Sequence, residues 1–292
     1  MSSAPVDLNN AEAVIDLFQE AATLLRDDPN RAGARVVLPP RGRLVVTGDL
    51  HENPFHYRKI ITMARLAEST DHHVILHELI HGDRLLNGMD FSYRMLGKVA
   101  QLVRAHPGQV HPMLANHELA QLTGKGVSKG AGNSVEFFRE ALAYVFRDDD
   151  AEVEAAINDF FRAMPLAVTS PDGVGCAHSL PDERVMASFD PGILDRPLED
   201  ADYLSPNGGA YQMTWGRRYT PTSAAQLAEA WNVKLFCLGH QHVESGIEMR
   251  GEQILVLNSD HDAARLLVVD LADLPSAELA LMSATPLASL PD

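Results

Sequence analysis

Four short segments of the chain place metal-binding side chains directly after apolar, β-type runs. They are Gly48-Asp49-Leu50-His51, Asn116-His117-Glu118, Cys176-Ala177-His178 and Gly239-His240-Gln241-His242. Imidazole nitrogens, carboxylate oxygens and amide oxygens are common ligands of divalent metal ions. Two such ions about 3.5–4 Å apart can activate a water, bind phosphoryl oxygens and offset the charge of an in-line displacement. Together the segments predict a two-metal site that could cleave phosphate esters.

The spacing within two of the segments allows paired ligands. Asp49 and His51 are two positions apart just past a strand, so both side chains can turn toward one ion. His240 and His242 repeat that spacing, and Asn116 offers an amide oxygen beside an imidazole. An isolated segment of this kind is more often a polar turn than a metal site. The presence of all the segments in one chain is what favours the metal site.

Short apolar and β-branched runs predict the strands that carry these segments. The predicted strands cover residues 43–47, 74–76, 110–114, 166–169, 174–178, 234–238, 253–257 and 265–269. In the first half of the chain they alternate with a helix predicted over residues 57–66. Strand–helix alternation with polar residues at strand ends is typical of a layered α/β fold, whose site lies at the carboxyl edge of its sheets.

Two helical regions flank this pattern. Apolar residues at helical spacing predict a helix over residues 10–25, with Asn9 or Asn10 as its N-cap. A glycine-rich stretch at residues 124–132 predicts a mobile loop, and a helical region follows it. We therefore expect residues 1–40 to be an N-terminal helical extension packed on one main domain, residues 41–292. The helical region at about residues 133–164 is expected to form a cap-like part of that domain.

Composition narrows the classes of protein that fit. The 292 residues, 46% of them hydrophobic, suit one large α/β domain, and no apolar run is long enough for a membrane span. Cys176 and Cys237 lie in apolar strand-like runs, and the N-terminus lacks a signal pattern, so we expect a cytoplasmic protein without disulfides. The net charge of −16 argues against duplex nucleic acid as a partner. It argues only weakly against small phosphorylated substrates.

The ordered segments resemble the calcineurin-like metallophosphoesterases, whose motifs run Asp-x-His, Gly-Asp-x-x-Asp, Gly-Asn-His-Glu, His and Gly-His-x-His. Within that superfamily, residues 40–270 are most similar to the phosphoprotein phosphatases. The similarity lies in residues 160–167, 176–181 and 240–246, and Trp215-Gly216-Arg217 resembles the Trp-x-Arg of bacterial members. The resemblance implies an α/β/β/α sandwich of two mixed β-sheets flanked by helices, with a dinuclear metal site at the carboxyl ends of the strands.

The resemblance also implies roles for individual residues. The first metal ion would be held by Asp49, His51 and His242, and the second by Asn116, His178 and His240. A carboxylate of the second motif would bridge the ions, which would be manganese, iron or zinc in a divalent or trivalent state. His117 would protonate the leaving alkoxide while a metal-bridging hydroxide attacks phosphorus directly, without a phosphoenzyme. Arg217 would clamp the phosphate through its planar guanidinium.

The second motif departs from the family pattern. Residues 77–84 read His-Glu-Leu-Ile-His-Gly-Asp-Arg in place of Gly-Asp-x-x-Asp-Arg-Gly. Alignment on the preceding strand puts Glu78 at the bridging position and His81 where the family has the Asp that orients the acid histidine. The competing alignment on Gly82-Asp83 makes Asp83 the bridge. We prefer Glu78 because it directly follows the apolar strand, and Asp83 could then replace the orienting carboxylate.

The residues before Asn116 depart as well, since Leu114-Ala115 stands where phosphoprotein phosphatases have Arg-Gly. One phosphate-binding arginine is therefore absent. Arg84 is a candidate to replace it, and Glu118 is a candidate for a supporting role beside the ligands.

These departures leave the substrate open among phosphorylated small molecules, nucleotides and proteins. We expect a metal-dependent phosphomonoesterase, with phosphoserine or phosphothreonine in proteins as one candidate substrate. The alternative is a phosphodiesterase or dinucleoside polyphosphate hydrolase, because His242 is present and the arginine is missing. A third reading, a catalytically weak binding protein of the same fold, follows from the altered second motif. The sequence leaves the oligomeric state open.

Overall fold

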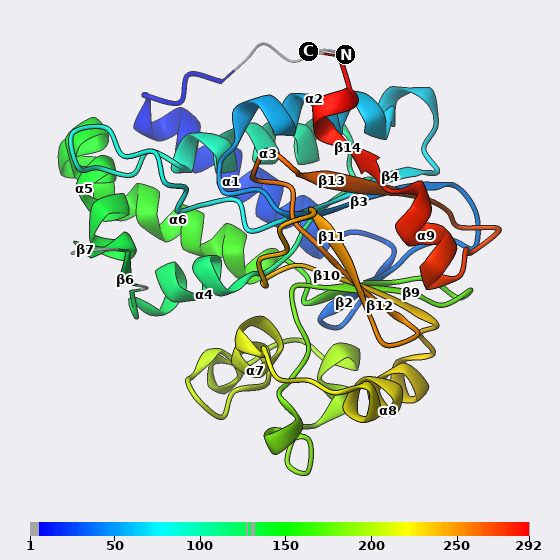
Figure 1. The fold of residues 1–292 in the computed structure, drawn as a ribbon. Helices are drawn as coiled ribbons and strands as arrows, with labels where there is room; N and C mark the ends of the chain where they lie inside the picture. Colours follow the sequence, from blue (N-terminus) through cyan, green and yellow to red (C-terminus); the bar gives the residue numbers. More distant parts are fainter. Residues whose placement is uncertain (1–5, 127, 130–131, 292) are drawn as a thin grey trace.

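Two β-sheets pack against each other in the computed structural model, which describes residues 6–126, 128–129 and 132–291 (Figure 1). The larger sheet consists, in spatial order, of β1 (Arg31–Ala32), β2 (Arg35–Val37), β8 (Ala167–Thr169), β9 (Val174–Ala177), β10 (Leu235–Leu238), β12 (Ile254–Leu257) and β11 (Ile247–Arg250). The smaller sheet consists of β14 (Thr285–Pro286), β13 (Arg265–Asp270), β3 (Arg43–Asp49), β4 (His72–His77) and β5 (Val110–Pro112).

The centre of each sheet is parallel, and antiparallel strands complete it. β3, β4 and β5 run parallel, and β13 pairs antiparallel with β3. β9, β10 and β12 likewise run parallel, and β11 pairs antiparallel with β12. The carboxyl ends of β3 and of β12 are joined by a bridge between Asp49 and Asn258. The loops that follow the parallel strands of both sheets therefore open onto one edge of the molecule.

A buried apolar layer lies between the sheets. The smaller sheet contributes Leu44, Val46, Ile75 and Leu267, and the larger sheet contributes Val168, Cys176, Cys237 and Leu255. A second, larger apolar cluster covers the outer faces, where the helices pack. Because the central strands are buried on both faces, they read in the sequence as continuous apolar runs. The predicted layered sandwich of two mixed sheets flanked by helices is confirmed.

Helices flank both sheets, and several helices in the first half of the chain pack against one another. The helices are α1 (Ala11–Arg26), α2 (Pro54–Ala64), α3 (Tyr93–Ala105), α4 (Asn116–Thr123), α5 (Ser134–Phe146), α6 (Asp150–Ala163), α7 (Gly209–Trp215), α8 (Pro221–Trp231) and α9 (Ala277–Ser283). Short 3-10 helices are η1 (Leu66–Glu68), η2 (Arg147–Asp149), η3 (Glu183–Val185), η4 (Pro191–Asp195), η5 (Asp200–Tyr203) and η6 (Leu287–Ser289). In Figure 1, α2 and α3 lie beside the smaller sheet, and α7 and α8 lie on the opposite side of the molecule.

The N-terminal segment is part of the same core. Asn10 caps α1 by accepting a hydrogen bond from the backbone N–H of Ala13, as predicted. α1 packs against α6 and α3, and the rings of Phe18 and Phe160 are 5.5 Å apart. Residues 31–37 also add β1 and β2 to the larger sheet, so the segment before residue 40 is not only helical. The division of the chain at residue 40 stays a prediction.

The region predicted to form a cap consists of α5 and α6, and α6 reaches the core through Phe160 and Phe161, which are buried. Before it, β6 (Ser128–Lys129) pairs with β7 (Gly132–Asn133). The mobile loop predicted at residues 124–132 lies partly outside the described residues, at positions 127, 130 and 131. No helix in the described part of the chain is long and apolar enough to cross a membrane.

Candidate metal centre

The segments selected from the sequence follow strands that end side by side. Asp49 ends β3, and the turn after it carries His51. Glu78 follows β4, and His240 follows β10. His51, Glu78, His81 and His240 all have a positive φ, between 42° and 68°. Such backbone conformations cost about 1–3 kcal/mol each in residues other than glycine, and they cluster at active sites.

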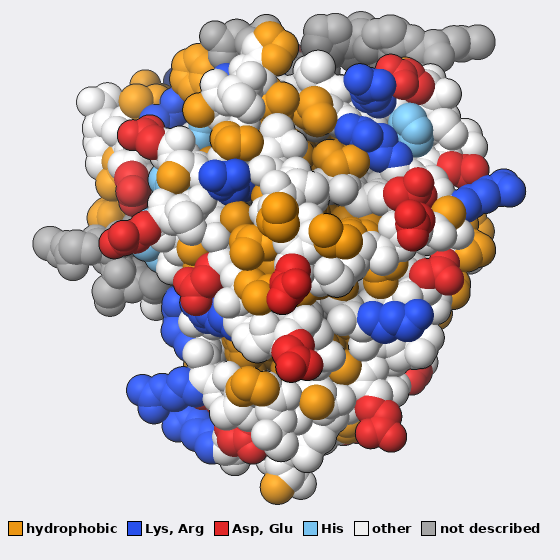
Figure 2. Space-filling view, turned by 45° about the vertical axis from the view of Figure 1, so that its right-hand side comes forward, with side chains coloured by type: hydrophobic (Ala, Val, Ile, Leu, Met, Phe, Trp, Pro, Cys, Tyr) orange, Lys and Arg blue, Asp and Glu red, His pale blue; other side chains and the backbone are white. Residues whose placement is uncertain are grey.

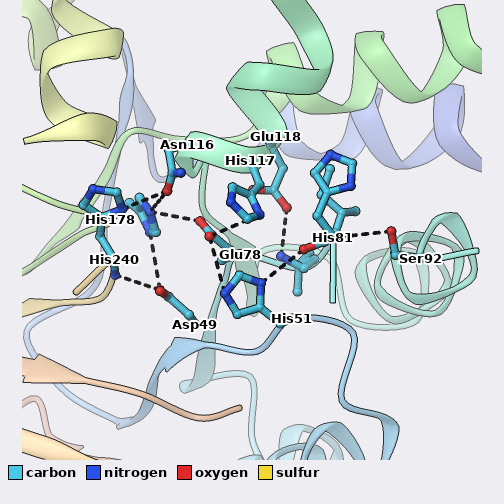
Figure 3. A network of polar contacts seen from close by, with 12 residues as sticks. Asp49, His51, Glu78, His81, Ser92, Asn116, His117, Glu118, His178 and His240 are labelled. Atoms are coloured by element: carbon cyan, nitrogen blue, oxygen red, sulfur yellow. Dashed lines mark hydrogen bonds and ion pairs between the residues drawn. The ribbon is translucent and has the colours of Figure 1, made fainter. Parts of the chain in front are cut away.

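Glu78 lies at the centre of the cluster (Figure 3). Its Oε1 is 3.6 Å from His51 Nε2 and 3.4 Å from His117 Nδ1. Its Oε2 is 3.0 Å from His178 Nε2. Burial alone would raise the pKa of Glu78, but the surrounding histidines outweigh it and hold the pKa well below its usual range. The carboxylate therefore stands ionised between imidazoles that come from separate parts of the chain.

Asp49 is the second buried carboxylate. Its Oδ1 accepts a hydrogen bond of 2.8 Å from the backbone N–H of His240 and is 3.7 Å from His178 Nδ1. Burial, followed by the negative charge of Glu78, raises the pKa of Asp49 well above its usual value. Two nearby buried carboxylates cannot both ionise readily without a compensating positive charge. A bound cation would supply that charge.

Asn116 joins two of the predicted histidine ligands. Its Oδ1 is 2.7 Å from His178 Nε2 and 2.8 Å from His240 Nδ1. Burial, and then the ring of His178, lowers the pKa of His240 to about 2, so its ring is neutral. Within the described residues, His178 Nδ1 and His240 Nε2 are buried and have no hydrogen-bond partner. Buried polar atoms without a partner are rare, and neutral imidazole is the form that binds metals.

Two groups of side chains could each hold an ion. In one group, ligand atoms of His51, Glu78 and His117 lie within 4.8 Å of one another, and in the other so do atoms of Asp49, His77 and His178. The donor set mixes imidazole, carboxylate and amide oxygen, which suits manganese, iron or zinc. The residues present therefore fit the metal pair that the fold implies.

The cluster opens into a cavity of about 530 Å³. Its polar walls are formed by Asp49, His51, Asn53, Glu78, Asp83, Arg84, Asn116, His117, Arg217, His240, His242, Asn258 and Asp260. Pro54 and Phe55 add an apolar side, and Phe55 is 58% exposed.

Four predicted site residues lie at the wall of the cavity rather than in the buried cluster. The exposed His242 packs its ring 5.1 Å from that of His261. Asp83 and Arg84 are exposed, and Arg84 Nε is 3.4 Å from a carboxylate oxygen of Glu52. The exposed Arg217 donates a hydrogen bond of 3.1 Å from one guanidinium nitrogen to the carbonyl oxygen of His240.

His81 and Glu118 support the cluster from behind. His81 Nδ1 is 2.6 Å from Asp90 Oδ2, both side chains are buried, and the His81 ring lies 5.5 Å from that of His117. Glu118 accepts a hydrogen bond of 2.8 Å from the backbone N–H of Leu79, next to Glu78. Burial, and then the charge of Glu78, raises the pKa of Glu118 to about 8.

Two residues of the site were not selected from the sequence. Asp90 lies in the segment before α3, and nothing in its local pattern indicates that it reaches His81. His77 directly precedes Glu78, so its place in the motif was a usable signal. Burial, and then the ring of His178, lowers the pKa of His77 to about 3.

Comparison with known proteins identifies the family to which this fold and this cluster belong. A model of the calcineurin-like phosphoesterases matches residues 42–244. The chain belongs to this family and is a metal-dependent phosphoester hydrolase. A search of curated proteins gave no match.

Solved structures of similar fold include two described phosphatases. One is a protein serine/threonine phosphatase from Saccharomyces cerevisiae with similarity to human phosphatase PP5, at 13% identity and a TM-score of 0.65. The alignment covers 89% of this chain and 83% of that chain. Another is the cold-active protein-tyrosine phosphatase of a psychrophile, a Shewanella species, at 14% identity and a TM-score of 0.59, covering 91% of this chain and 84% of that chain. At these identities the likeness concerns the fold alone.

Proposed function

We propose that the protein hydrolyses phosphate monoesters at two metal ions held around Glu78. The supporting observation is that the two oxygens of this buried carboxylate face different histidines, His51 and His117 on one side and His178 on the other. The proposed ligands of the first ion are Asp49, His51 and the exposed His242 at the cavity wall, and those of the second are Asn116, His178 and His240. Bound ions supply water activation and neutralise phosphoryl charge.

In this proposal His117 is the general acid. It is the second residue of α4, is 7% exposed and lines the cavity, so its ring can reach a bound substrate. Its Nδ1 lies 3.4 Å from Glu78 Oε1, so the ring stands beside the centre of the cluster. A protonated ring at this place can transfer a proton to the leaving alkoxide.

Arg217 is proposed to bind the phosphate. Its guanidinium stands at the cavity wall and contacts the carbonyl oxygen of His240, next to the proposed ligands. Its backbone N–H donates to Asp182, which holds the residue in place. A guanidinium offers several parallel N–H donors to a phosphate. Arg84, across the same cavity, is the candidate for a second contact.

The test begins with metal-free protein that is reloaded with manganese and assayed on p-nitrophenyl phosphate and a phosphoserine peptide. Asp49→Ala is expected to be inactive on both. His117→Ala is expected to lose about 100-fold or more on the peptide and less on p-nitrophenyl phosphate, whose leaving group needs no protonation. His106→Ala, at a half-buried position that does not line the cavity, serves as the control. Full activity of Asp49→Ala, or an equal loss of His117→Ala on both substrates, would contradict the assignments.

A second candidate function is hydrolysis of phosphodiesters or dinucleoside polyphosphates. Leu114 and Ala115 are fully buried beside Asn116, so no arginine reaches the cavity from these positions. Weaker recognition of a phosphate dianion would favour diesters or anhydrides. Turnover of bis-p-nitrophenyl phosphate and of a dinucleoside polyphosphate above that of the monoester would select this function.

The surface charges and the two cysteines support proposals about the partners of the protein and its location in the cell. Figure 2 shows acidic and basic side chains interspersed over one face, with no continuous basic stripe among the residues described there. We propose a phosphorylated small molecule, nucleotide or protein as substrate. Cys176 and Cys237 are free and buried, which supports the cytoplasm as the proposed location.

A further inference from the structure

His77 is a buried histidine that the proposed ligand set leaves out. It is the last residue of β4, its side chain is 0% exposed, and it pairs in register with Asp49 on β3. Within the described residues, neither of its ring nitrogens has a hydrogen-bond partner. A buried polar group without a partner destabilises the folded state, so packing alone would favour an apolar side chain here.

Two other side chains that can bind a metal ion surround His77. One nitrogen of its ring, a carboxylate oxygen of Asp49 and a nitrogen of His178 lie within 4.8 Å of one another. The rings of His77 and His178 are 5.9 Å apart. All these side chains are buried, so they do not form a solvated surface cluster.

Gly239 allows the backbone of its loop to lie close to these atoms. A Cβ at this position would collide with Asp49 Oδ1 and would lie 3.1 Å from His77 Nδ1. A carboxylate oxygen and an imidazole nitrogen therefore face the same small volume, above a residue without a side chain.

We infer that His77 is a ligand of one of the two proposed metal ions, beside Asp49 and His178. This inference rests on the proposed two-metal function and extends its ligand set. The second motif of the calcineurin-like pattern has glycine where this chain has His77, and glycine has no ligand to offer. The ligand is therefore a feature of this chain. It adds a neutral nitrogen donor to a centre whose His242 lies exposed at the wall.

The first experiment asks whether residue 77 touches the metal. Metal-free wild type, His77→Cys and His111→Cys are each loaded with cobalt(II), and their absorption spectra are compared. His111 is the matched control because it is 1% exposed on the adjacent strand β5 and contacts His73 instead of the cluster. His77→Cys is expected to gain a thiolate-to-cobalt absorption band, and His111→Cys is expected to match the wild type. Cobalt-loaded His77→Cys without that band would overturn the inference.

The second experiment measures metal affinity and stability in His77→Leu and His111→Leu. His77→Leu is expected to bind one ion at least about tenfold more weakly than the wild type, as measured by manganese titration and elemental analysis. His111→Leu is expected to keep the wild-type metal affinity. Without metal, His77→Leu is expected to melt at or above the wild-type temperature, because it removes an unpartnered polar group from the core.

The outcomes of the two experiments distinguish the role inferred for His77 from the proposed two-metal function on which it rests. A wild type that binds no metal would contradict the proposed function. A wild type that binds two ions, with unchanged affinities in His77→Leu, would contradict only the role of His77. A His77→Leu protein that melts well below His111→Leu without metal would show that residue 77 serves packing, and would also count against the inference.

Discussion

At the residue scale, the two candidate bridging carboxylates of the second motif differ in burial and in neighbours. Glu78 is 3% exposed and contacts His51, His117 and His178, whereas Asp83 is exposed at the cavity wall. This difference supports the proposal that Glu78, and not Asp83, bridges the two ions.

We therefore expect Glu78→Gln to weaken metal binding and to lower kcat/KM by at least about 100-fold, because it removes the charge shared by the histidines. Asp83→Asn is expected to keep wild-type metal stoichiometry and to change kcat/KM by less than about tenfold. Elemental analysis and steady-state assays of the two variants measure this. The reverse ranking would assign the bridge to Asp83.

Asp90 is the residue that holds His81 against His117. The Asp90–His81 contact of 2.6 Å is buried, and Ser92 donates its backbone N–H to the other oxygen of Asp90. Asp90→Asn leaves the shape almost unchanged but removes the charge that fixes the His81 ring. We expect kcat on a phosphoserine peptide to fall about tenfold, with little change in KM, metal content or melting temperature.

Asp71→Asn, at an exposed ion pair with Arg41, is the control for this change. An equal loss in kcat on p-nitrophenyl phosphate would mean that Asp90 does not act through proton transfer. A large fall in melting temperature would make its role structural.

Most of the cluster could be predicted from residue types and order, because Asp49, Glu78, His178 and His240 lie at or just after the ends of strands. Asp90 could not, since it reaches His81 through a loop whose path depends on tertiary packing. The exposed position of His242 likewise depends on how its loop packs against His261.

At the element scale, the strands that were predicted are those buried on both faces. β3, β4, β9, β10, β12 and β13 read as apolar runs, and the structure contains each of them. β1, β2 and β14 have two or three residues, which leaves little local signal. They form through pairing of β1 with β2, of β2 with β8 and of β14 with β13. β11 is half exposed and begins with one buried residue, so its pattern is weak as well.

Two buried histidines on the paired strands β4 and β5 predict that the stability of the fold depends on pH. His73 Nδ1 is 3.2 Å from His111 Nε2, and burial lowers the pKa of His73 and lowers that of His111 to about 3. The unfolded chain, with a histidine pKa near 6.5, takes up protons first as the pH falls. The stability from the neutral pair is thus present above about pH 6.5 and is lost between about pH 6.5 and 3, by up to about 1.4 kcal/mol per pH unit for each proton.

Urea unfolding of the metal-free wild type and of His111→Leu at pH 7, 6, 5 and 4 measures this effect. We expect a shallower fall in unfolding free energy for His111→Leu than for the wild type. Parallel curves for the two proteins would show that His111 does not contribute to the pH dependence.

At the scale of the whole molecule, the metal centre joins the two sheets. Asp49 and Glu78 extend from strands of the smaller sheet, whereas His178 and His240 extend from strands of the larger sheet. The layered architecture was predictable because each sheet has its own run of buried strands. The contact between the sheets at this edge depends on side chains far apart in the sequence.

Metal removal should therefore destabilise the whole fold, and not only the site. A ligand that binds only the native state stabilises it by about 2.7 kcal/mol at 100 times its dissociation constant. Burial, and then repulsion from Glu78, raises the pKa of Asp49, and the ions would relieve that repulsion. We expect a chelator to lower the melting temperature of the wild type in a single transition, with near-UV and far-UV circular dichroism changing together. Asp49→Ala should show a much smaller response to the chelator, and a wild-type melting temperature unchanged by chelation would contradict a metal link between the sheets.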